Sequence, residues 1–103
     1  YTIVKGRVFM SQTRNKYKAL HGKLNVTGEN INRIRTEKNM SAQQLSDKLI
    51  IIGLDIHRQA IYDIERGNRT VADYELCAIA EMLNVSTDIL LKDFSKIVKE
   101  DKK

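Results

Sequence analysis

The residues best suited to chemistry lie between positions 58 and 69, in the stretch RQAIYDIERGNR. Apolar residues recur there at Ala60, Ile61 and Ile64, which is the spacing of one buried face of an α-helix. The outward positions of the same helix hold Arg58, Gln59, Tyr62, Asp63 and Arg66. Arginine presents a planar fork of donors and glutamine a donor beside an acceptor, so this face suits paired hydrogen bonds with flat polar groups. It is either an ordinary solvated helix face or a surface that recognises something specific.

Catalytic and metal-binding patterns are not apparent in the sequence. The two histidines, His21 and His57, and the single cysteine, Cys77, are scattered, whereas metal sites need clustered ligands. Glu65, in the IERG stretch, is a better candidate for a structural ion pair than for a catalytic acid. No Ser–His–Asp set or glycine-rich phosphate loop is visible either. The sequence therefore predicts no enzymatic activity, no metal and no cofactor.

Length and composition indicate one small, all-α domain. The chain has 103 residues, of which 42% are hydrophobic and 30% charged, and it contains no proline. A proline-free chain of this kind favours helices. The apolar run at residues 49–52 is far too short to span a membrane. One cysteine cannot form an internal disulfide, which fits a cytoplasmic protein.

The net charge of +5 is unevenly distributed along the chain. Residues 1–27 carry a charge of +6, and residues 92–103 carry +2. Residues 28–91 contain seven basic and ten acidic side chains, a balance of −3. The basic character thus lies at the two ends, and any binding of nucleic acid by the middle must depend on where individual side chains are placed.

Periodicity predicts five short helices that must pack together, because helices of about ten residues are marginal alone. The first, third and fifth helices are expected at Glu29–Lys38, Ile56–Arg66 and Thr87–Lys92, the last capped by Ser86. The second helix begins at Ser41 and has Leu45, Leu49 and Ile52 on its apolar face. The fourth helix is capped by Thr70, and its core face consists of Leu76, Ile79, Ala80 and Leu83.

The helix ends carry their own signals. Ser41 followed by Gln44 is a capping-box pattern at the start of the second helix. Gly53, Gly67 and Asn84 are expected to end the second, third and fourth helices. The cap of the third helix stays open between Asp55, the better capping residue, and His57.

Three segments follow from these patterns. Residues 1–27 are expected to be a flexible basic arm, whose first nine residues precede a natural start at Met10. Residues 28–92 form the helical domain. Residues 93–103 are a short amphipathic, Lys-rich tail that either contributes to a dimer contact or covers the core.

The segment from Ile31 to Leu91 resembles the phage-repressor and Cro-like helix-turn-helix family, also called XRE. The resemblance rests on MSAQQLSDKL for the second helix, IHRQAIYDIERGNR for the third, and VADYELCAIAEMLNVSTDILL for the last two. It implies a lambda-repressor-like fold whose third helix reads DNA. The junction IIIGLDI departs from the family, because it is about five residues longer than usual, which puts the docking geometry in doubt.

The resemblance implies roles for individual residues. Arg58, Gln59, Tyr62 and Asp63 would face base edges, with arginine suited to guanine and glutamine to adenine. Asp63 would accept from cytosine or hold Arg58 or Arg66 in position. The DNA backbone would be contacted by Gln43, Arg66, Asn68 and Arg69 and by the arm residues Arg14, Lys16 and Lys18. Arg35 of the first helix would form a partly buried ion pair with Glu65 of the third.

These expectations describe a cytoplasmic repressor that binds double-stranded DNA as a homodimer, at an inverted-repeat operator. The alternative is an antitoxin-type protein that binds a toxin and regulates its own operon. A toxin or an anti-repressor is therefore a possible protein partner, and no membrane association is expected.

Overall fold

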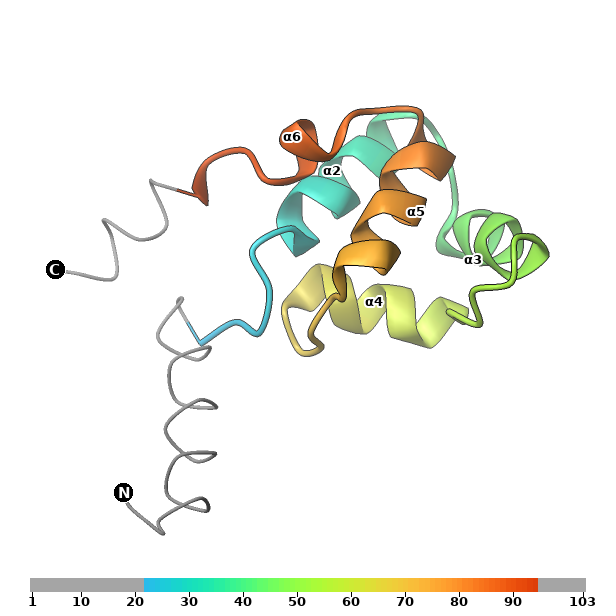
Figure 1. Ribbon diagram of the computed structural model, residues 1–103, viewed down its shortest axis with the longest axis horizontal. Coiled ribbons are helices and arrows are strands. Elements are labelled where there is room, and N and C mark those ends of the chain that lie inside the picture. The colour runs from blue at the N-terminus through green and yellow to red at the C-terminus, as the bar shows by residue number, and fades with distance from the viewer. Residues whose placement is uncertain (1–21, 95–103) are drawn as a thin grey trace, which may run out of the picture.

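Five α-helices form the part of the chain that the computed structural model describes, residues 22–94 (Figure 1). They are α2 (Gly28–Glu37), α3 (Ala42–Ile51), α4 (Arg58–Arg66), α5 (Asp73–Leu83) and α6 (Thr87–Leu90). The predicted all-α, five-helix fold is confirmed, and the helix ends lie within about two residues of those that periodicity predicts. Within the described range, no helix has the length and apolar character needed to cross a membrane.

The hydrophobic core lies where all five helices meet. It contains Ile31, Ile34, Ala42, Leu45, Leu49, Ile56, Ile61, Ile64, Ile79, Ala80, Leu83 and Leu90. The core face predicted for the fourth helix is confirmed, with Leu76 packed against the core as a half-buried member. The prediction for Ile52 was wrong: this side chain is 51% exposed, because α3 ends at Ile51 and the chain turns away from the core.

Helices α2 to α5 all end in the same backbone arrangement. Each is followed by a residue with positive φ: Asn39, Gly53, Gly67 and Asn84. After α3, the N–H of Gly53 donates to Ile50 and that of Leu54 donates to Leu49, both at 2.9 Å, which is the Schellman pattern. The three predicted stops are confirmed, and Asn39 is a fourth that was not predicted.

The start of α3 is also as predicted. The backbone N–H of Gln44 donates to the Ser41 hydroxyl at 3.0 Å, and the Ser41 N–H donates to Gln44 Oε1 at 2.8 Å. This reciprocal pair satisfies two backbone donors that the first turn of a helix otherwise leaves without partners.

The cap of α5 differs from the prediction, and the cap of α4 is one of the two residues that the sequence left open. Helix α5 begins at Asp73 with Ala72 as its cap, so the prediction of Thr70 was wrong. The Ala72 N–H donates to Glu75 Oε1 at 3.0 Å, so the carboxylate satisfies the backbone donor of the capping residue, whereas the hydroxyl expected from threonine would accept from an N–H of the first turn. His57 rather than Asp55 is the capping position of α4, and its Nε2 lies 2.7 Å from Asp55 Oδ1.

Residues 22–27 contact the helices, although they lie before residue 28, where the sequence predicts that the domain begins. Asn25 is the cause. Its Oδ1 accepts from the N–H groups of Thr27 and Gly28 at 3.0 and 2.7 Å. Its Nδ2 donates to the carbonyls of Ile64 and Arg69 at 2.9 and 2.8 Å. One side chain thus ties the start of α2 to the end of α4. Residues 1–21 and 95–103, with most of the predicted arm and tail, lie outside the described residues.

Glu75 gives the fold a defined pH dependence. Burial raises the pKa of this carboxyl, but hydrogen bonds from Arg69 and from the Ala72 N–H outweigh burial and leave it lowered. A lowered folded pKa stabilises the fold above the usual glutamate pKa, and this stabilisation is lost as pH falls through the folded value. We expect the difference in unfolding free energy between the native chain and Glu75→Gln to be largest at neutral pH and to shrink on acidification. Urea titrations at several pH values would measure it, and a difference that grew towards acid would contradict the assignment.

Candidate nucleic-acid interface

Helices α3 and α4 are joined by an ordered junction, residues 52–57. Its backbone turns at Gly53, which has φ of +96°, and Ile56 returns the chain to the core at 2% exposure. The fully buried Ser46 hydroxyl donates to the Ile56 carbonyl at 2.8 Å and fixes the junction to α3. The additional residues therefore extend the turn without releasing α4 from α3, and the two helices remain in contact.

Helix α4 has one buried and one outward face, as the sequence predicts. Ile61 and Ile64 are each 1% exposed. On the opposite side, Arg58, Gln59 and Arg66 are exposed, and Tyr62 and Asp63 are half-buried. The outward face therefore presents five polar side chains on a helix that the core holds in place.

Four of these outward residues are joined in pairs one helical turn apart. Gln59 Nε2 donates to Asp63 Oδ1 at 3.2 Å. The guanidinium of Arg66 lies 5.6 Å from the centre of the Tyr62 ring, a cation–π distance. Asp63 therefore contacts Gln59, and among the described residues no ion pair joins it to Arg58 or Arg66 as the sequence analysis allowed.

Behind this face, Glu65 anchors α4 to α2. Arg35 Nε donates to Glu65 Oε2 at 2.7 Å and Nη2 donates to Oε1 at 3.0 Å, within the 4 Å expected for the pair. The side chains are 9% and 5% exposed, so the pair is buried. The hydrogen bond to Glu65 raises the pKa of Arg35 despite the opposing effect of burial. The guanidinium also donates to the Met40 carbonyl at 2.8 Å.

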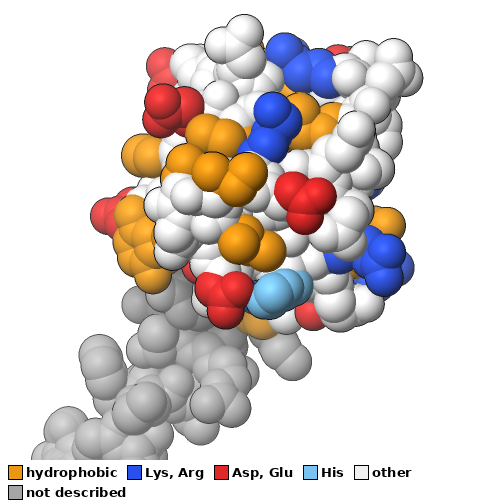
Figure 2. Space-filling view, turned by 90° about the vertical axis from the view of Figure 1, so that its right-hand side faces the viewer, with side chains coloured by type: hydrophobic (Ala, Val, Ile, Leu, Met, Phe, Trp, Pro, Cys, Tyr) orange, Lys and Arg blue, Asp and Glu red, His pale blue; other side chains and the backbone are white. Residues whose placement is uncertain are grey.

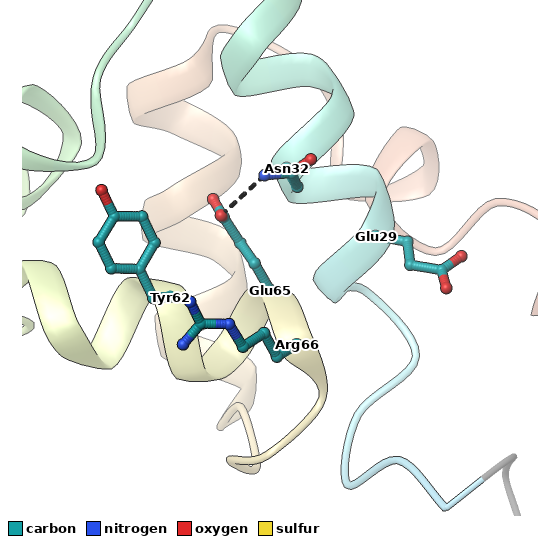
Figure 3. Close-up of a pocket in the computed structure, with 5 residues that line it drawn as sticks. All are labelled: Glu29, Asn32, Tyr62, Glu65 and Arg66. Carbon is teal, nitrogen blue, oxygen red and sulfur yellow. Dashed lines mark hydrogen bonds between the residues drawn. The ribbon is translucent and has the colours of Figure 1, made fainter.

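A polar hollow lies between the first half of α2, which contributes Glu29 and Asn32, and the second half of α4 (Figure 3). Asn32 donates to Glu65 Oε1 at 2.9 Å across it, and Tyr62 and Arg66 line the side formed by α4. Figure 3 shows the Arg66 guanidinium turned toward Tyr62, whereas Glu29 points away from the other four side chains. The outward face of α4 and the buried ion pair are thus adjacent along one helix.

The side chains predicted to contact the DNA backbone lie in different environments. Gln43 is exposed on the first turn of α3 and donates to Asp47 Oδ1 at 2.9 Å. Asn68 is exposed directly after α4. Arg69 is held by Glu75 at 3.1 Å and also donates to the Thr70 carbonyl, so its guanidinium already has protein partners. Arg14, Lys16 and Lys18 lie outside the described residues.

An exposed apolar cluster adjoins the junction. Ile50, Ile51 and Ile52 are 39%, 82% and 51% exposed. They belong to the end of the molecule formed by α3 and its turn, where Figure 2 shows hydrophobic side chains gathered among a few charged ones. The three consecutive isoleucines therefore place a contiguous apolar surface beside the turn between α3 and α4.

Two residues that support the site were missed in the sequence. Asn25 lies in the segment that the sequence assigned to the arm. An asparagine just before a helix can cap the N–H groups two and three residues later, as Asn25 does for Thr27 and Gly28, and this signal is recognisable in a sequence. Asn32 carried no such signal, because its bond to Glu65 joins residues 33 positions apart. Both asparagines fix α2 relative to α4 and so position the outward face.

Comparison with known proteins assigns the fold to a family. A family model described as helix-turn-helix matches residues 31–90, which is more than half of the chain and nearly the segment on which the sequence resemblance rests. Comparisons with curated proteins and with solved structures returned no match. In the matched range, α3 and α4 are the two helices on either side of the turn, and α4 carries the outward polar face. The chain therefore belongs to the helix-turn-helix family of the phage-repressor and Cro-like (XRE) type, a family of DNA-binding transcriptional regulators.

Proposed function

We propose that this protein is a repressor that binds an inverted-repeat operator as a homodimer, with α4 of each protomer in a major groove. The observation that carries the proposal is the outward face of α4, where Arg58 and Gln59 are exposed on a helix whose other side is buried. A major groove admits one α-helix, and two-fold related half-sites lie about 34–36 Å apart.

Each outward residue has a role in this proposal. Arg58 pairs with guanine and Gln59 with adenine, while Tyr62 contacts a thymine methyl group or a phosphate. Gln43 and Asn68, at the start of α3 and after α4, contact phosphates and set the position of the protein on the duplex. Arg69 holds the loop through Glu75 and so supports Asn68. The arm residues Arg14, Lys16 and Lys18 add charge-driven, sequence-independent affinity.

The proposal is tested by selecting bound duplexes from a random library with the full chain, at about 0.15 M salt, where electrostatic attraction is screened. We expect an inverted repeat to be enriched. Arg58→Ala and Gln59→Ala should each relax the preference at one base pair per half-site by about 5- to 150-fold, which corresponds to about 1–3 kcal/mol for a bidentate contact.

Arg33→Ala is the matched control. Arg33 lies on α2, is half-exposed and pairs with Glu37 at 3.7 Å, so its removal deletes one positive charge away from the outward face of α4. It should weaken binding to all duplexes equally. If a folded chain enriches no sequence, the repressor proposal fails, and the antitoxin-type function, in which a toxin is the main partner, takes its place.

A further inference from the structure

The hydrogen bond between Gln59 and Asp63 has a consequence for base recognition, and the inference drawn from it rests on the proposed function. The two residues lie one turn apart on the outward face of α4, with Gln59 Nε2 3.2 Å from Asp63 Oδ1. Gln59 is exposed, whereas Asp63 is half-buried beside it. The neighbouring Arg66 is directed to the Tyr62 ring, so Asp63 has Gln59 as its side-chain partner.

A glutamine amide must be oriented correctly to recognise adenine. The carbonyl oxygen accepts from the adenine N6 amino group, and the N–H beside it donates to N7. An amide that turns over exchanges its oxygen and nitrogen and loses this match. A free glutamine samples both orientations, and its N–H groups can also donate to the two acceptors of guanine.

An ionised carboxylate removes this ambiguity because it only accepts hydrogen bonds. Asp63 can bind the nitrogen end of the amide and not the oxygen end. Adenine needs the carbonyl oxygen and the N–H beside it, so the inference requires that Asp63 accepts from the other N–H, which is directed toward the stem of the glutamine. The pair that adenine needs is then left free.

We propose that Asp63 is a positioning residue that fixes the amide of Gln59 and thereby sets the preference for adenine at the base pair that Gln59 reads. Its negative charge is unfavourable near phosphate, so Asp63 exchanges some overall affinity for discrimination. This role differs from direct recognition of cytosine by Asp63, which would act at another base pair and would not depend on Gln59.

The chain contains a matched control for this pair. Gln43 and Asp47 have the same residue types, the same one-turn spacing and a 2.9 Å hydrogen bond, but they lie on α3. A glutamine–aspartate pair at this spacing also stabilises a helix slightly, so an effect on helix stability alone would appear equally in both pairs. Only the pair on α4 should affect base preference.

The experiment measures competition binding of the full chain to four duplexes that differ only at the base pair relaxed by Gln59→Ala. Asp63→Ala should reduce the preference for adenine by about 5- to 20-fold, a part of what a bidentate contact contributes. Asp63→Asn presents a donor as well as an acceptor and can bind either end of the Gln59 amide, so it should also reduce the preference, by about 2- to 20-fold. Asp47→Ala should leave the preference unchanged, and in the Gln59→Ala background Asp63→Ala should add no further loss at this base pair.

Several results would overturn the inference. If the preference for adenine of Asp63→Ala stays within twofold of the native preference, the hydrogen bond plays no part in base recognition. A loss at a different base pair, present also in the Gln59→Ala background, would show direct reading by Asp63. If the native chain selects a sequence but Gln59→Ala relaxes no position, the inference fails while the proposed function stands; if the native chain selects none, both fail. Circular dichroism of each variant verifies the fold.

Discussion

Replacing Glu65 with glutamine is expected to lower the free energy of unfolding by roughly 3–5 kcal/mol, because it leaves the buried guanidinium of Arg35 without a counter-charge. Arg35 is 7% exposed and cannot recover its hydration without opening the contact between α2 and α4. The two hydrogen bonds at 2.7 and 3.0 Å make the native geometry bidentate, which glutamine cannot reproduce. Urea unfolding followed by circular dichroism would measure the loss as a lower midpoint with an unchanged slope.

The double variant Arg35→Met with Glu65→Gln distinguishes the contribution of charge to the free energy of unfolding from the contribution of packing. Replacing a buried ion pair by uncharged residues of similar size is often close to neutral, so the double variant should recover much of the stability that each single variant loses. Asn32 still has an acceptor in the glutamine at position 65. Additive losses in the double variant would show that the ion pair is not what holds these helices together.

Replacing Gly28 with alanine is expected to lower the free energy of unfolding, whereas the same substitution in most helices raises it. Alanine normally stabilises a helix by about 1 kcal/mol relative to glycine. Here the new Cβ would lie 2.2 Å from the Ile64 carbonyl oxygen and 3.0 Å from that of Glu65. These are backbone atoms, which move only if α2 and α4 separate, so we expect a net loss of about 1–3 kcal/mol.

Thr36→Ala provides the control for Gly28→Ala in the same helix. Thr36 is exposed and its hydroxyl donates only to carbonyls of its own helix, those of Asn32 and Arg33, so its alanine substitution should be neutral or slightly stabilising. Thermal unfolding of the two variants would then move in opposite directions. A higher midpoint for Gly28→Ala would show that α2 can move away from α4 without cost.

The sequence predicted the helices well because the signals for them are local. Apolar spacing defined the buried face of α4, the Ser41 and Gln44 pattern defined the start of α3, and Gly67 defined the end of α4. Each of these depends on residues within one or two turns. The prediction for Ile52 was wrong for the same reason. The apolar spacing continues through Ile52, but whether this side chain reaches the core depends on the tertiary path of the chain after α3.

The parts of the site that were not predicted are long-range. Asn25 bonds to the carbonyls of Ile64 and Arg69, 39 and 44 residues away, and such contacts leave no periodic trace in the sequence. The contact of Gln59 with Asp63 is different, because a four-residue spacing on a helix makes it readable. The prediction favoured Arg58 or Arg66 as the partner of Asp63, because an arginine is a stronger electrostatic partner for an aspartate than a neutral amide is.

The isoleucines at the end of α3 matter most when the chain is unfolded. In the native structure their backbone groups belong to a helix and its turn, so no strand edge is available. Together with Leu49 they form four consecutive uncharged residues, three of them β-branched, in a chain without proline. Such a segment pairs readily with copies of itself once it is extended. We therefore expect the yield of refolding at high protein concentration to depend on how quickly Leu49, Ile50 and Ile51 re-enter α3 and Ile52 its turn, in competition with encounters between chains.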